Sequence, residues 1–181
     1  HTGEPASGNS LISRRVIYTL SNILKIPNIK SDEIILSVMW SDPIRTDLFA
    51  SIGETYKWPE LTQHKGNTEP LRLGEGFNTF ESILRLQSFC KLNKIKYVFH
   101  TMKNIFTNKD GEFLHKQYKE TEHLFEQIDF ENFQFVNDYD GLYEYAIENK
   151  LPFWDDNLHV QWDGHKIYFN NVIKKRILEI I

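Results

Sequence analysis

The chain has 181 residues, a formal net charge of −4, 40% hydrophobic residues and 25% charged residues. This length can bury the core of one domain, and the scattered Lys and Arg residues argue against a nucleic-acid partner. No apolar run reaches the roughly 18 residues needed to cross a bilayer, so we expect a soluble protein. A single cysteine, Cys90, excludes an internal disulfide and favours a cytoplasmic or virion-associated location over secretion.

The first part of the chain predicts a helix, a buried strand and a long loop. Apolar residues recur at helical spacing from Asn9 or Ser10 to Leu24, and Pro27 ends the pattern. The nearly continuous apolar run at 32–40 is typical of a strand covered on both faces in a parallel sheet. Residues 41–75 contain several Gly and Pro residues with little periodicity, which predicts a long excursion with at most one short helical turn.

The rest of the chain alternates between helical and strand patterns. We predict helices at 78–94, 112–128, 141–150 and 165–179, a strand at 95–102, and a short strand or irregular segment at 130–136. Such alternation indicates βαβ units, and therefore an α/β fold with a mainly parallel sheet between two helical layers, a three-layer α/β/α arrangement. We treat residues 1–181 as one domain.

Chemistry in such folds lies where strands end and helices begin. Three places qualify: Gly8-Asn9, the segment 40–42, and the segment 153–165. In the last segment Asp156 precedes His159 by three residues. A carboxylate can hold an imidazole in one tautomer and stabilise the imidazolium that forms when the histidine removes a proton. This pair is therefore our candidate for general-base catalysis.

The longer pattern in this segment is more specific than the pair alone. The D-x-x-H of Asp156 and His159 is followed six residues later by Gly164-His165 and an amphipathic helix. This block resembles the closing block of the SGNH (GDSL-like) hydrolases, whose fold is flavodoxin-like. The resemblance implies that Asp156 is the catalytic acid and His159 the base. Val160 stands where the family often has Pro.

The resemblance also assigns residues near the start of the chain. The segment ASGNSLISRRVIY resembles the second family block, which implies that Gly8 and its neighbour Asn9 help to line an oxyanion hole. The third block normally supplies an Asn after a strand, and Ser41 stands near that place as a weaker donor. Arg45 could add positive charge or bind an anionic substrate.

The family's first block, a strand followed by the nucleophilic serine, has no match in these residues. Ser7 and Ser10 do not follow an apolar strand. We therefore expect the serine to lie upstream of His1, and we expect a preceding segment or a second chain to complete the sheet.

Alternative interpretations stay open for several of these residues. The carboxylates and histidines at 155–165 could bind zinc or manganese, although the chain has neither an H-E-x-x-H motif nor a cysteine pair, and we expect no metal and no cofactor. His165 could be structural, and His100 could line the site or pack in the core. Trp154 and Trp162 could stack on sugar rings or pack beneath the loop.

Two functions follow from the sequence. The first is an SGNH-like serine esterase acting on a small-molecule or carbohydrate ester, plausibly an O-acyl group, with Asp156 and His159 as its acid and base. The second is a non-catalytic module of the same fold that serves in a viral particle or a surface-glycan system.

Overall fold

The fold was analysed in a computed structural model that describes residues 8–43, 45–47, 51–52, 55–56, 61–63, 69–107, 111–113, 119–155 and 159–181. The α-helices of this part of the chain are α1 (Asn9–Ile23), α2 (Glu69–Leu92), α4 (Glu122–Phe125), α5 (Leu142–Glu148), α6 (Trp162–Tyr168) and α7 (Lys174–Ile180). The strands are β1 (Ile35–Trp40), β2 (Arg45–Asp47), β3 (Ser51–Ile52), β4 (Thr55–Tyr56), β5 (Leu61–Gln63) and β6 (Lys96–Thr101). Short 3-10 turns span Ser31–Glu33, Lys119–Thr121 and Phe130–Asn132, and a π-helical turn, Phe169–Ile173, joins α6 to α7.

β1 and β6 form a two-stranded parallel sheet, with Ile35 opposite Lys96 at one end and Trp40 opposite Thr101 at the other. The two strands are separated in sequence by α2, which is the connection that the alternating pattern predicts. Phe133 adds one isolated parallel bridge to Phe99. The prediction of an α/β fold with parallel strands is confirmed at this level, and the segment 130–136 is a 3-10 turn followed by this bridge.

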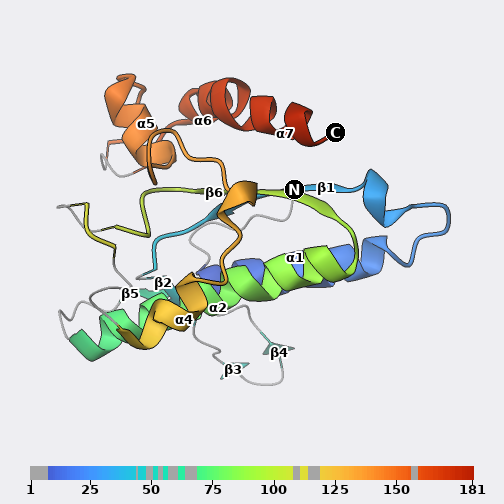
Figure 1. Cartoon of the computed structure of the whole chain (residues 1–181). Coiled ribbons are helices and arrows are strands. Elements are labelled where there is room, and N and C mark those ends of the chain that lie inside the picture. Colours follow the sequence, from blue (N-terminus) through green and yellow to red (C-terminus); the bar gives the residue numbers. More distant parts are fainter. Residues whose placement is uncertain are drawn as a thin grey trace.

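Helices cover both faces of the strand pair (Figure 1). Side chains alternate along a strand, so Val38 and Phe99 face a core shared with α1 and α2, where Leu20 and Ile83 are buried. On the opposite face, Met39 packs against a second and smaller cluster. That cluster comes from the C-terminal part of the chain and contains Leu142, Ala146, Val160, Tyr168 and Ile173.

The excursion between β1 and α2 holds short strands that the sequence did not predict. β2 pairs with β5 and β3 pairs with β4, in both cases antiparallel. α2 begins at Glu69, well before the helix expected from residue 78. The expected start relied on Asn78 as a capping residue, but Asn78 lies inside the helix, where its carbonyl accepts a hydrogen bond from the Ser82 hydroxyl.

The helix predicted for 112–128 is present in only part of its described length: residues 119–125 are helical, whereas 112–113 and 126–128 are not. Phe113 forms an isolated bridge with Thr107, and regular helix is confined to the 3-10 turn and to α4. Packing explains the difference, because the Phe113 ring lies 5.4 Å from that of Phe125 and 5.1 Å from that of Tyr139. Contacts between distant aromatic rings thus override a weak helical pattern.

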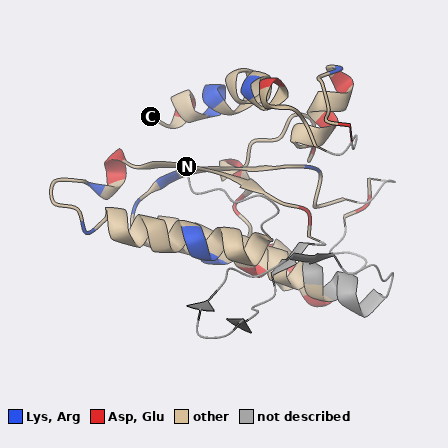
Figure 2. Ribbon diagram, turned by 180° about the vertical axis from the view of Figure 1, so that it is seen from behind, with Lys and Arg blue, Asp and Glu red and all other residues tan. Residues whose placement is uncertain are grey.

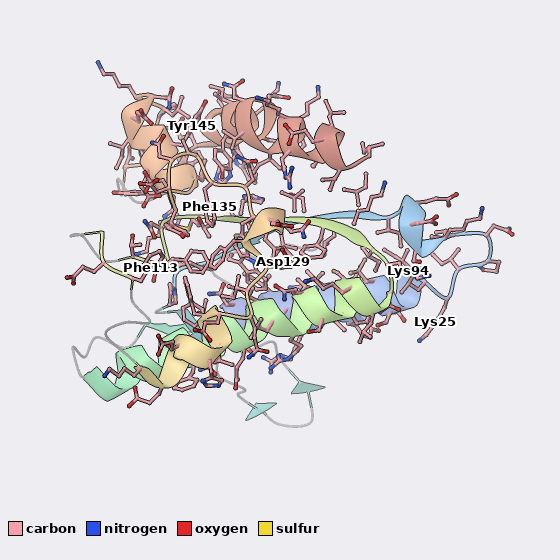
Figure 3. All side chains as sticks on the ribbon, viewed as in Figure 1. Lys25, Lys94, Phe113, Asp129, Phe135 and Tyr145 are labelled. Carbon is pink, nitrogen blue, oxygen red and sulfur yellow. The ribbon has the colours of Figure 1, made fainter. Side chains whose placement is uncertain are left out.

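The ends of the strands define two ends of the molecule. Lys25 and Lys94, which follow α1 and α2, lie far from Tyr145 on α5 (Figure 3).

Charges of both signs are spread over the described elements, without a block of one sign (Figure 2). Among the described residues, no helix has the length and apolar character that crossing a membrane requires.

Candidate functional site

Asn9, at the start of α1, holds the end of β1 in place. Its Oδ1 accepts a hydrogen bond from the Ser41 backbone N–H at 2.8 Å, and its Nδ2 donates to the Ser41 carbonyl at 3.0 Å. Nδ2 also donates to the Thr79 hydroxyl of α2 at 3.0 Å. Asn9 and Ser41 are buried, so these bonds satisfy backbone groups that would otherwise be costly to bury. One side chain therefore fixes the mutual position of α1, α2 and β1.

The loops that follow β1 and β6 are joined to each other. The Met102 N–H donates to the Trp40 carbonyl at 2.8 Å, which continues the parallel ladder by one bond. Beyond it, Lys103 forms an ion pair with Asp42. We call residues 8–9, 41–42 and 102–104 the strand-end rim. It is the edge where open parallel sheets bind ligands.

α5 begins directly against this rim. The Tyr143 N–H donates to the Met102 carbonyl at 2.7 Å. Gly141 allows this approach, because a Cβ at that position would lie 2.3 Å from the Thr101 carbonyl oxygen. Glu144 then accepts hydrogen bonds from the backbone N–H groups of Gly141, at 2.9 Å, and of Asn104, at 3.1 Å. The start of α5 is thus part of the same edge.

The segment with His159 forms a short hairpin next to α5. Phe153 bridges Val160 in antiparallel fashion, and the Trp154 N–H donates to the His159 carbonyl at 2.9 Å. The Phe153 ring packs edge-on against Tyr143, with centroids 5.6 Å apart. Because Tyr143 is bonded to the rim, the contacts run continuously from the strand ends to the hairpin.

Gly164 and His165 lock this hairpin to the first turn of α6. A Cβ on Gly164 would lie 2.4 Å from the Val160 side chain, so the glycine permits close packing. His165 makes a side-chain hydrogen bond to the Val160 backbone, and burial lowers the pKa of its imidazole. The geometry favours the structural interpretation of His165, although its predicted place at the substrate site stays a prediction.

His100 is buried beneath α6 on the face of the sheet that carries the smaller cluster. Its ring centroid lies 5.8 Å from that of Tyr168, and its Nε2 lies 3.4 Å from the Ser37 hydroxyl. Burial, together with the charge of the neighbouring His165, lowers the pKa of His100 to about 3. His100 is therefore a neutral, packed histidine, which is the packing alternative raised by the sequence.

The remaining predicted site residues are placed unequally. Asp156 lies outside the described residues, and so does the side chain of Arg45, although its backbone is in β2. His159 and Trp154 are exposed on the hairpin. Gly8 is buried as the residue before α1. The structure thus brings Gly8, Asn9 and Ser41 together and connects the hairpin to them through α5.

The Asp42–Lys103 ion pair was not predicted from the sequence. Asp42 lies in the segment 40–42, one of the three predicted places, whereas Lys103 lies in none of them. The available signal was position, since each residue follows the end of one of two paired strands by two residues. The ion pair places one positive and one negative group at the strand-end rim. Charged groups of this kind orient polar ligands through hydrogen bonds.

Within the described ranges, no three His, Cys, Asp or Glu side chains are grouped so that they could hold a metal ion. Comparisons with protein-family models, with curated proteins and with solved structures gave no match.

Proposed function

We propose that this chain is an SGNH-like serine hydrolase domain that cleaves a small-molecule or carbohydrate ester. The proposal includes a three-layer, flavodoxin-like sheet that extends beyond β1 and β6, completed by a preceding segment or a second chain. The observation that carries it is the location of the His159 hairpin. Contacts from Phe153 through Tyr143 to Met102 hold the hairpin at the same end of the strands as Gly8 and Ser41.

The proposed reaction proceeds through an acyl-enzyme. His159 removes the proton of a serine hydroxyl supplied by sequence upstream of His1, and the serine oxygen attacks the ester carbonyl. The tetrahedral intermediate then collapses, and the departing alcohol takes the proton from His159. Water, activated by the same imidazole, releases the acid. Asp156 keeps the His159 ring in the reactive tautomer.

The rim limits which groups can stabilise the oxyanion. Asn9 uses both of its Nδ2 hydrogens, on the Ser41 carbonyl and the Thr79 hydroxyl, whereas Asn104 donates one Nδ2 hydrogen to the Thr107 hydroxyl. Backbone N–H groups near Gly8, at the start of α1, would then carry most of that role, because a helix start favours negative charge. Arg45 and Ser41 remain proposed contributors.

The test is hydrolysis of p-nitrophenyl acetate by the protein with its upstream sequence. His159→Ala should lower kcat/KM by about 10³-fold or more, and Asp156→Asn should also cause a large loss. His123→Ala on α4 is the matched control, because His123 is exposed and distant in sequence from the hairpin. Unchanged turnover in His159→Ala would refute the enzymatic proposal.

The fully engaged side-chain amide of Asn9 favours a second candidate, a non-catalytic module of a viral particle or surface-glycan system. A fluorophosphonate probe separates the two functions. Labelling of a serine in the wild type, reduced by His159→Ala, supports the hydrolase. No labelling together with no turnover supports the binding module.

A further inference from the structure

Two exposed tryptophans flank the proposed catalytic histidine. Trp40 is completely buried in the core, whereas Trp154 is 50% exposed and Trp162 is 77% exposed. Large aromatic side chains are usually buried, and leaving an indole in water forgoes favourable transfer energy. Neighbouring exposed aromatics next to a reactive group therefore mark a candidate binding surface.

The hairpin geometry places Trp154 directly beside His159. Phe153 bridges Val160, and the Trp154 N–H bonds to the His159 carbonyl, so Trp154 and His159 are cross-strand partners. Side chains alternate along a strand. Because Val160 is buried and Phe153 packs on the smaller cluster, the side chains of Trp154 and His159 both lie on the outward face. Directly opposed residues have Cβ atoms about 5 Å apart.

The second indole, that of Trp162, lies at the start of α6 and its ring contacts a histidine ring. The Trp162 ring centroid is 6.1 Å from that of His165, which is itself bonded to the Val160 backbone. Trp162 is thus attached to the base of the same hairpin.

The polar groups around these indoles indicate the kind of ligand. Asp155 follows Trp154, Asp163 follows Trp162, and both are exposed. Sugar rings have C–H faces that pack on an indole and hydroxyl groups that donate to carboxylates. Exposed carboxylates also disfavour an anionic glycan, because like charges repel. Exposed indoles that are each followed in the sequence by an exposed carboxylate thus suit an uncharged sugar better than an anionic one.

We infer that Trp154 is a specificity-determining residue that stacks on a neutral sugar ring of an O-acylated carbohydrate, presenting its acyl group to His159, with Trp162 as a second stacking surface. This inference rests on the proposed hydrolase function for its catalytic part. Its binding part stands on the hairpin geometry.

The kinetic test compares two esters on the protein with its upstream sequence. Trp154→Ala should raise KM for partially O-acetylated glucomannan oligosaccharides by about tenfold, the effect of one lost stacking contact, with kcat nearly unchanged. Turnover of p-nitrophenyl acetate should stay within about twofold of the wild type. Trp154→Phe should return KM most of the way to the wild-type value. Tyr18→Ala, which removes an exposed aromatic side chain of α1, should change neither KM nor kcat. Equal losses on both esters would overturn the inference.

Binding without turnover distinguishes this inference from the proposed function. In the His159→Ala background, deacetylated glucomannan oligosaccharides should change the tryptophan fluorescence in a saturable way, and adding Trp154→Ala should weaken that binding. If the wild-type protein has no esterase activity while the His159→Ala protein binds the oligosaccharides saturably, the sugar-stacking role of Trp154 is supported and the hydrolase is refuted. Absence of binding, or binding that Trp154→Ala leaves unchanged, would overturn the stacking role of Trp154 even if the esterase is active.

Discussion

The two faces of the β1–β6 sheet are packed by different kinds of residues. The face covered by α1 and α2 has a large core in which Phe106 contacts a ring of other aromatics. The face covered by α5, α6 and α7 has a smaller core, in which Tyr168 packs beside the buried His100. Because the first core buries more apolar area, it should contribute more to stability than the smaller core near the proposed site.

The largest effect should come from the centre of the first face. Phe106 is fully buried, and its ring lies between 5.2 and 6.1 Å from six other aromatic rings. Phe106→Ala should lower the free energy of unfolding by about 3 to 5 kcal/mol, measured by urea denaturation. Phe169→Ala on the other face, 45% exposed, should cost less than about 1 kcal/mol. Similar costs for both variants would remove the contrast.

The second face should respond to acid through His100. Its folded pKa, about 3, lies below the ordinary value of 6.5, so the unfolded chain binds the proton first as the pH falls. Stability from this group is therefore complete above pH 6.5 and is lost progressively between pH 6.5 and 3. Between pH 7.5 and 5 the free energy of unfolding of the wild type should fall by about 2 kcal/mol more than that of His100→Gln, as measured by urea denaturation at each pH. His165, whose pKa is also lowered, adds in the same direction. Parallel pH profiles for wild type and variant would contradict the neutral, buried state of His100.

The smallest effect concerns a pair of tyrosines on the second face. The Tyr168 hydroxyl is buried without a partner, whereas the Tyr145 hydroxyl accepts a hydrogen bond from Asn171 Nδ2 at 3.1 Å. Removing an unsatisfied buried hydroxyl relieves a desolvation cost, so Tyr168→Phe should leave the melting temperature unchanged or raise it slightly. Tyr145→Phe should lower stability by about 0.5 to 1 kcal/mol. Destabilisation by Tyr168→Phe would indicate that its hydroxyl has a partner, such as an ordered water.

Local sequence patterns predicted the elements that carry strong periodicity. The helix from Asn9, the apolar strand ending at Trp40 and the helix after Gly141 are all present. Their signals are internal to the segment, because amphipathic spacing and apolar runs depend on neighbours a few residues away. The final helix was also predicted, although it begins at Trp162.

The candidate site was predicted less completely, because its roles depend on contacts between distant residues. The sequence selected Gly8, Asn9 and Ser41 as neighbours, but the structure shows why they meet: Asn9 bonds to Ser41, 32 residues away, and to Thr79, 70 residues away. Gly164-His165 was selected as a motif, and its packing on Val160 gives it a structural reason. The hairpin partnership of Trp154 with His159 needed the backbone pairing.

The sequence by itself determined the first helix, the two parallel strands, the helix between them and the C-terminal helices, and with them the parallel α/β character, because these follow from periodicities that each segment carries alone. Tertiary structure decided the short length of α4, the burial of His100 and the closeness of Gly141 to Thr101. Each of these depends on contacts with residues that are distant in the sequence. A local pattern cannot predict such contacts, because the packing energy depends on which distant segments lie side by side in the folded chain.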